Sequence, residues 1–276
     1  MAQTGHLTGT PRAAEPWLSP VTRLRIVILL TTLVIWEAIA ASGILLREVV
    51  PSVVTIGRAL AELLFHPDLK VSLLAHDYRI PAFYWHLYVT ISEVAAALVI
   101  GGTTGLAVGL ALGANPFLSK AFERYLYYLG PTPKIVFFPV MIMWFGVGPE
   151  SKIAMGTLSC FFPVVLSAAS GMRMIEGVLI RVGRSFRLNT WQMVSKIYLP
   201  AMREPIVNGV RLGMGVAMIG TLLAETKLSN KGIGFMIIDA YNTFDMPRMY
   251  AVLLMLFVIA IGANALVGRA SRGTRS

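Results

Sequence analysis

The chain has 276 residues, of which 56% are hydrophobic and only 14% are charged, whereas an ordinary soluble domain carries about 25% charged residues. Several apolar stretches approach the roughly 20 residues that cross a bilayer, which excludes a separate soluble domain and predicts a polytopic membrane protein. The net charge of +10 is spread over short connections instead of one basic patch, which argues against nucleic-acid binding. A single cysteine, Cys160, excludes an intrachain disulfide.

The N-terminal part divides into a tail, a span and a surface helix. Residues 1–20 are polar and contain Pro, Gly and Thr, a composition that predicts a disordered tail. The first span is expected at about 24–43, with a cleaved signal peptide as the alternative because residues 38–40 (AIA) resemble a cleavage site. Residues 53–65 predict a short amphipathic helix on the membrane surface, with Ser52 as its N-cap.

The second span is expected at about 87–112 and ends at Asn115 and Pro116. Glycines at four-residue spacing let another helix approach closely, and ordinary packing within the subunit accounts for them: Gly101, Gly105, Gly109 and Gly113.

The remaining spans are expected at about 135–145, 153–171, 206–224 and 249–267, with a basic and aromatic connection at 116–133. The third span is short and contains Pro139, which frees a backbone carbonyl. Such a carbonyl is tolerated in a membrane only beside protein or a cavity, so we expect this helix to be internal and near a pathway.

A cationic segment at 174–200 separates the fourth and fifth spans. Its apolar residues recur at helical spacing up to a polar break at Asn189 and Thr190, and a second short helix follows that Leu199 and Pro200 close. A membrane protein seldom keeps so long and patterned a loop unless a partner docks on it. Residues 21–270 are therefore expected to form one transmembrane domain with a docking loop at 173–205, followed by a C-terminal tail at 271–276.

The charges also predict an orientation. With the N-terminus inside and six spans, the inside segments hold 16 Lys and Arg against four acids, and the outside connections hold eight of each. This bias favours cytoplasmic termini and a cytoplasmic docking loop.

At this point the residues resemble a known family, the permeases of ABC importers, over nearly the whole chain after the tail. The end of the docking loop, 197–200 (IYLP), and the pair Trp191 and Gln192 are similar to the coupling loop of these permeases. Other segments are similar to the sulfonate, nitrate and taurine subfamily: 131–146 (PTPKIVFFPVMIMWFG), 161–163 (FFP), 208–213 (NGVRLG), 224–225 (AE) and 232–234 (GIG).

The docking loop departs from the family pattern in its charge. Arg181, Val182 and Gly183 stand at the Glu-Ala-Ala positions, and Arg187 replaces the family glycine. Either the partner ATPase presents acids to this edge, or a different permease subunit carries the standard loop. The resemblance implies these ATPase-coupling residues: Leu179, Arg181, Val182, Gly183, Arg184, Arg187, Leu188 and Asn189.

The resemblance also implies an all-α fold with six transmembrane helices and a coupling helix, in a bacterial inner membrane. The partners would be two ATPase subunits, a second permease subunit and an external solute-binding protein. The chain has no phosphate-binding loop, so it is not expected to be an enzyme or to bind a cofactor; ATP and Mg would sit in the ATPase. The solute would be a small organic or inorganic anion such as a sulfonate, taurine or nitrate, while pyrimidine precursors and aromatic acids stay open.

Two further sets of residues are candidates for the pathway and for intramembrane charge. Met141, Met143, Met214, Met218 and Thr221 would line the pathway, with plain packing as the alternative. The acids are Glu37, Glu93 and Glu225.

For Glu93, which stands where relatives often carry Arg, we weigh a snorkelling or salt-bridged role against substrate contact, and Glu225 is expected to form a structural pair. His66, His76 and His86 lack the geometry of a metal site. A secondary transporter would need internal repeats or an ion site, and an intramembrane hydrolase a nucleophile motif; neither is evident in the sequence.

Overall fold

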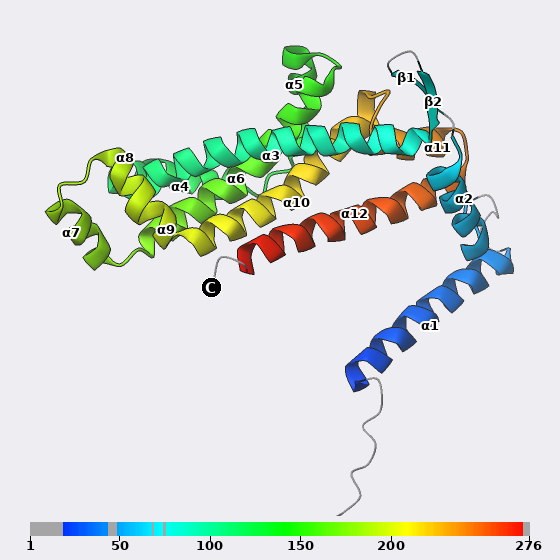
Figure 1. Ribbon diagram of the computed structural model, residues 1–276, viewed down its shortest axis with the longest axis horizontal. Helices are drawn as coiled ribbons and strands as arrows, with labels where there is room; N and C mark the ends of the chain where they lie inside the picture. The colour runs from blue at the N-terminus through cyan, green and yellow to red at the C-terminus, as the bar shows by residue number, and fades with distance from the viewer. Residues whose placement is uncertain (1–18, 44–48, 68, 74–75, 273–276) are drawn as a thin grey trace, which may run out of the picture. The chain divides into compact units, whose positions relative to one another are not determined.

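The computed structural model describes residues 19–43, 49–67, 69–73 and 76–272. Most of the predicted N-terminal tail and residues 273–276 of the C-terminal tail therefore lie outside the described residues. The chain divides into two compact units, Met1–Thr55 and Ile56–Ser276, and each is described by itself. Figure 1 shows the labelled helices and strands.

The first unit contains helix α1 (Pro20–Ser42), which confirms the first predicted span. Ser19 caps its start by accepting a hydrogen bond from the Thr22 amide at 3.2 Å, and Gly43 ends it with a φ of 68°. The Glu37 carboxylate accepts a hydrogen bond from the Val53 amide at 2.9 Å, so this acid satisfies the first backbone N–H of the following helix.

The surface helix α2 (Val53–Phe65) has the predicted bounds. The Ser52 hydroxyl accepts a hydrogen bond from the Thr55 amide at 3.2 Å, so the predicted N-cap is confirmed. An antiparallel hairpin of β1 (Leu69–Leu73) and β2 (His76–Ile80) follows, with Leu69 opposite Ile80. The sequence pattern did not predict this hairpin, which interrupts an otherwise helical chain.

The second unit is a helical bundle built on α3 (Ala82–Ala114), α6 (Pro149–Arg173) and α10 (Arg203–Leu228), which contact one another. Helix α12 (Met246–Arg272) packs against α10 and against the short helix α11 (Ile233–Asn242) (Figure 1). The predicted second, fourth, fifth and sixth spans are thereby confirmed, and α11 is an addition that the sequence pattern did not reveal.

Glycines form the contact between α3 and α6. A Cβ atom added at Gly109 would lie 2.7 Å from the carbonyl oxygen of Val165, and one added at Gly101 would lie 2.8 Å from that of Thr157. Gly102 faces away from this contact, and nothing lies within 4 Å of a Cβ added there. The predicted close helix packing is confirmed, because any side chain on this face would push the two backbones apart.

The region between α3 and α6 differs from the prediction. Residues 116–133, expected as a connection, contain helix α4 (Pro116–Leu129), which Asn115 caps by accepting from the Phe117 amide at 2.9 Å. The 3-10 turn η1 (Lys134–Phe137) and helix α5 (Phe138–Phe145) follow, and the pair is bent by 95° at the break. An asparagine followed by a proline can end one helix and start the next. The sequence pattern predicted only the end of the first helix at this place.

Helix α5 is not internal in the described chain. Met143 and Trp144 are 84% and 73% exposed. Pro139 does not require an internal position, because it lies in the first turn of α5, where its missing N–H removes no helical hydrogen bond. Among the described residues five helices are long and apolar enough to cross a membrane, and the predicted count of six holds only if the bent pair counts as one span.

Lys134 holds the bend between α4 and α5. Its Nζ donates hydrogen bonds to the carbonyl oxygens of Leu129, Gly130 and Thr132 at 3.0, 2.6 and 2.6 Å, and it lies 4.8 Å from the centre of the Phe162 ring. A lysine at a helix C-terminus satisfies carbonyls that have no partner within the helix.

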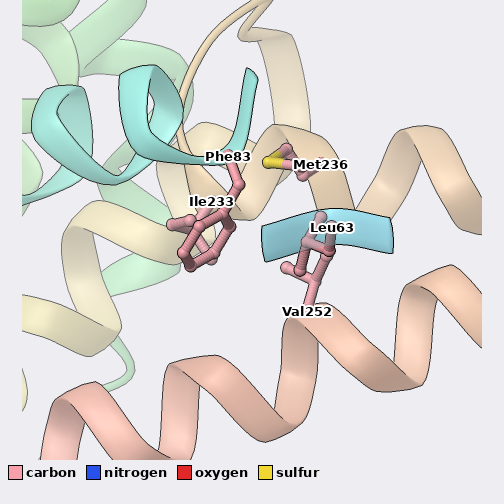
Figure 2. Close-up of a cluster of buried hydrophobic side chains, with 5 residues drawn as sticks. All are labelled: Leu63, Phe83, Ile233, Met236 and Val252. Atoms are coloured by element: carbon pink, nitrogen blue, oxygen red, sulfur yellow. The ribbon is translucent and has the colours of Figure 1, made fainter. Parts of the chain in front are cut away.

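One hydrophobic cluster joins α2, α3, α11 and α12. Figure 2 shows its five buried side chains, drawn together from these four helices: Leu63, Phe83, Ile233, Met236 and Val252. The cluster fixes α11 against the bundle, and with it the turn at residues 229–232 that precedes α11.

Candidate coupling surface and translocation pathway

The docking loop folds as predicted into a helix, a polar break and a second helix. Helix α7 (Gly177–Ser185) is followed by α8 (Thr190–Met193), the π-helical turn η2 (Val194–Tyr198) and α9 (Leu199–Ala201). At the break, Asn189 accepts from the Gln192 amide at 2.8 Å while the Gln192 side chain accepts from the Asn189 amide at 3.1 Å. This reciprocal capping fixes where the second helix begins.

Gly183 positions α7 on the segment behind it. It is buried, and a Cβ added there would lie 2.5 Å from Ile197 Cδ1 and 2.6 Å from Met193 Sδ. Of the predicted coupling residues, Gly183 therefore faces inward, and it acts by letting α7 lie close to α8 and η2.

The outer surface of α7 combines positive charge with apolar side chains. Arg181, Arg184 and Arg187 are all exposed, as the predicted cationic edge requires. Leu179 and Val182 are 42% and 45% exposed. Leu188 is half-buried and Asn189 is exposed at the cap. Figure 1 shows α7 at the end of the bundle where α3 ends and α10 begins.

Two large aromatic side chains on this surface escaped the sequence prediction of coupling residues. Phe186 and Trp191 are 77% and 76% exposed, beside the polar break. Aromatic residues left exposed around charged ones are typical of protein interfaces. The sequence contained a signal for these two residues, because both lie close to the polar break at Asn189 and Thr190.

Arg187 has a backbone φ of 50°, in the left-handed region. Glycine adopts this conformation without steric cost, whereas a residue with a Cβ atom loses about 1–2 kcal/mol there. The loop thus keeps the glycine-type turn geometry although the side chain at the turn is arginine.

An ion pair joins the start of the docking loop to the short helix α4. Arg173 Nη2 lies 2.8 Å from Glu123 Oε1, and Ser119 donates to the other carboxylate oxygen of Glu123 at 2.7 Å. Because Arg173 is the last residue of α6, the pair connects the start of the docking loop to α4.

The predicted pathway residues do not form one group in the described chain. Met214 and Met218 line a cavity of about 650 Å³ between α10 and α12. Met141 packs in a cluster with Phe138, whereas Met143 is almost fully exposed. Thr221 is fully buried, and its hydroxyl faces Gly156 of α6.

A second, smaller cavity lies between the bend and the bundle. It has a volume of about 290 Å³ and includes Lys134, Met155, Ser159 and Gly220 in its lining. None of the predicted pathway residues is in this lining.

The intramembrane acids have different environments. Glu225 is fully buried and accepts hydrogen bonds from Thr90 Oγ1 and from the Gly234 amide, both at 2.7 Å. Thr90 Oγ1 in turn accepts from the Ile233 amide at 2.8 Å. These hydrogen bonds hold Glu225 against α3 and the start of α11, and its structural role stays a prediction.

Glu93 is only 4% exposed and lies one turn from Thr90, which donates to Glu225. The side chain is buried between helices and does not snorkel to the surface, whereas the salt-bridged role and the substrate contact stay predictions. Glu37 belongs to the first unit, where it caps α2. His86 accepts a hydrogen bond at Nδ1 from the Gly232 amide at 2.9 Å, so it too holds the turn before α11.

A membrane-crossing bundle with a patterned helix projecting from one end defines the class of transport permeases that a partner drives. Residues 101–276 match the family described as binding-protein-dependent transport system inner membrane component, and the chain belongs to this family. It is an ABC importer permease subunit of the sulfonate, taurine and nitrate subfamily, as the resemblance implied.

The relatives align over most of the chain. The aliphatic sulfonates transport permease protein SsuC of Bacillus subtilis strain 168 is 29% identical to this chain. The alignment covers 82% of this chain and 76% of SsuC. The taurine transport system permease protein TauC of Escherichia coli strain K12 is 29% identical over 67% of this chain and 68% of its own. The bicarbonate transport system permease protein CmpB of Synechococcus elongatus is 27% identical over 85% of this chain and 81% of its own length.

A solved structure has the same fold. The inward-facing MetNI methionine ABC transporter contains a chain that superimposes with a TM-score of 0.60, covering 67% of this chain and 93% of that one at 18% identity. The likeness confirms the predicted all-α permease architecture.

Proposed function

We propose that this chain and a second permease subunit form the pore of an ATP-driven importer for a small anion. The apolar face around α5 supports the second subunit. Val136, Met143 and Trp144 are 68%, 84% and 73% exposed, and α5 has only eight residues, too few to cross a bilayer alone. Packing against a second permease subunit covers these side chains and completes the membrane segment.

Two ATPase subunits, which bind ATP and Mg, drive the pore through α7. The exposed surface of α7 and of the turn and helix α8 that follow it supports this, because it presents three arginines and two aromatic rings at the free end of the bundle. An ATPase groove that receives this face carries acidic residues, opposite in charge to the Arg181–Arg187 edge.

The packing supplies a route by which a push on α7 reaches the membrane helices. Gly183 seats α7 on Met193 and Ile197, and the same segment continues through η2 and α9 into α10. At that junction Met202 is fully buried, and Gly171 of α6 lies against Pro205 of α10. Movement of α7 is therefore passed to α6 and α10 together, and ATP biases the equilibrium between the two pore states.

The transported solute is a small anion that an external binding protein delivers. The names of the relatives support this, since aliphatic sulfonates, taurine, nitrate and bicarbonate each carry an anionic group. The positive charge of the docking loop and of both terminal regions supports a bacterial inner membrane location with cytoplasmic termini.

The decisive experiment is co-expression with neighbouring ATPase genes, followed by native mass measurement of the purified complex. We expect two permease subunits and two ATPases, and ATP-dependent uptake of labelled anions when the complex is reconstituted with the binding protein. Two copies of this chain would define a homodimer, and one copy beside another permease a heterodimer. A purified chain that transports without any ATPase would contradict the proposal and favour a secondary transporter.

A further inference from the structure

A buried polar cluster lies near the end of α10 remote from the docking loop. Thr90 and Glu93 on α3 and Thr221 and Glu225 on α10 are between 0% and 4% exposed. Thr90, one turn from Glu93 on α3, donates to Glu225 at 2.7 Å, so the two carboxyl groups lie at the same contact of α3 with α10. Two carboxyl groups thus share a site inside the membrane bundle, where an uncompensated charge costs several kcal/mol.

The charges around this pair do not balance. Lys152 of α6 is 5% exposed and faces both carboxyl groups, while its Nζ donates to the carbonyl oxygens of Val147 and Gly148 at 2.7 and 3.0 Å. Glu150, also on α6, faces Glu93 from the exposed side and adds negative charge. The turn before α11 carries the exposed Lys231, and its Gly232 amide donates to His86 of α3 at 2.9 Å. Among the buried groups alone, two carboxylates against one ammonium leave one negative charge, which a single bound cation of charge +1 removes.

The hydrogen bonds of the two carboxyl groups indicate which of them binds this cation. Both oxygens of Glu225 accept hydrogen bonds, from Thr90 and from the Gly234 amide. In the described part of the chain, Glu93 Oε2 and Thr221 Oγ1 are buried polar atoms without a hydrogen-bond partner. The unfilled hydrogen-bonding capacity of the pair is therefore at Glu93 and not at Glu225.

Helix geometry brings Thr221 toward the same seam. Thr221 lies one turn from Glu225 on α10, and Ala97 lies one turn from Glu93 on α3. A Cβ added at Gly156 would contact both the Thr221 hydroxyl and the Ala97 side chain. The hydroxyl thus faces the contact of α3 with α6, one turn along from Glu93.

We propose that Glu93 and Glu225 form a binding site for one proton inside the helical bundle, with the proton carried on Glu93. A protonated Glu93 donates to Glu225, which stays ionised and keeps its bonds from Thr90 and Gly234. A metal ion fits the site poorly, because hard cations take about six oxygen ligands and both oxygens of Glu225 are already engaged.

The proton also affects how firmly the turn before α11 is held in place. Glu225 holds the Gly234 amide and Thr90 holds the Ile233 amide, so the cluster fixes the start of α11. Release of the proton places two negative charges side by side against this turn. Because the folded chain holds a proton that an unfolded chain releases at neutral pH, stability falls as pH rises.

The test is thermal unfolding of the purified full-length chain in detergent between about pH 6 and pH 9, and it needs neither an ATPase nor a solute. For the wild-type chain we expect the midpoint to fall by roughly 5 °C or more across this range. Glu93→Gln carries a permanent neutral donor in the same shape, so its midpoint should change little with pH. Glu62→Gln, on exposed α2, is the matched control and should keep the wild-type slope.

A second measurement does not depend on any variant folding. Infrared spectra of the wild-type chain should contain the band of a protonated carboxyl group at neutral pH, and the band should vanish on alkalinisation. Absence of this band, or an identical pH slope in wild type and Glu93→Gln, overturns the proposal. If sodium chloride but not choline chloride raises the midpoint at pH 9, and Glu93→Gln loses that effect, the site binds sodium and the proton assignment is wrong.

Discussion

The two ends of the bundle are built on opposite principles. At the α11 end, Glu225, Thr90 and two backbone amides are buried and joined by hydrogen bonds, and a hydrophobic cluster encloses the turn beside them. At the α7 end, the charged and aromatic side chains are exposed, and Gly183 is buried against Met193 and Ile197.

The difference shows what each end is suited to do. Buried polar groups with fixed partners tolerate few substitutions, because each lost hydrogen bond leaves a desolvated group behind. Exposed charges cost little to change in the isolated chain, so their role appears only when a partner binds. We therefore expect substitutions at the α11 end to change the stability of the chain, and substitutions at the α7 end to change its association with the proposed ATPase.

The largest effect is expected in the glycine contact that supports both ends. Gly109→Val places methyl groups against the α6 backbone near Val165, and it should destabilise the chain by about 3 kcal/mol or more. The yield of monodisperse protein in size-exclusion chromatography measures this. Gly102→Ala, on the open side of the same helix, should be neutral or slightly stabilising. Equal losses for both variants would show that α3 and α6 do not pack as described.

The buried end can be probed by removing one hydroxyl. Thr90→Val keeps the shape of the side chain but leaves the Ile233 amide without its acceptor, at a cost of about 1–3 kcal/mol. Thermal unfolding in detergent measures the change, and Thr90→Ser should retain most of the wild-type stability. If valine is tolerated as well as serine, the hydrogen bonds of this end are not what stabilises it.

The exposed end should respond in binding and not in folding. Arg181→Glu reverses one charge of the proposed coupling surface, and we expect about tenfold weaker ATPase association with a reduced salt dependence. Co-purification at two salt concentrations measures this, with Lys227→Glu at the far end of α10 as the control. Unchanged co-purification and transport of the double variant R181E/R187G would show that charge matching is wrong.

The smallest effect is expected at the strained turn after α7. Arg187→Gly and Arg187→Ala remove the same charge, but only glycine relieves the left-handed backbone, so glycine should be more stable by about 1 kcal/mol. Thermal unfolding of the two variants isolates this difference. Equal midpoints would mean that the turn relaxes once the arginine is gone.

Much of this molecule follows from the sequence alone. Length and apolar runs predicted five of the described helices, since the bilayer demands a minimum length and leaves the backbone no other partner. Local chemistry also predicted the Ser52 cap and the break at Asn189, because capping depends on residues within one turn.

Contacts between distant segments were decided only by the tertiary structure. Glu93 on α3 and Glu225 on α10 lie in one buried polar cluster, and no periodicity within either helix reveals that they meet. The same holds for α5, whose exposure depends on the 95° bend that Lys134 stabilises. The sequence determined the long apolar helices and the helix-break-helix pattern of the loop that we propose as the docking site. Packing decided which polar groups share a buried site, because burial is a property of neighbours that are far apart in the chain.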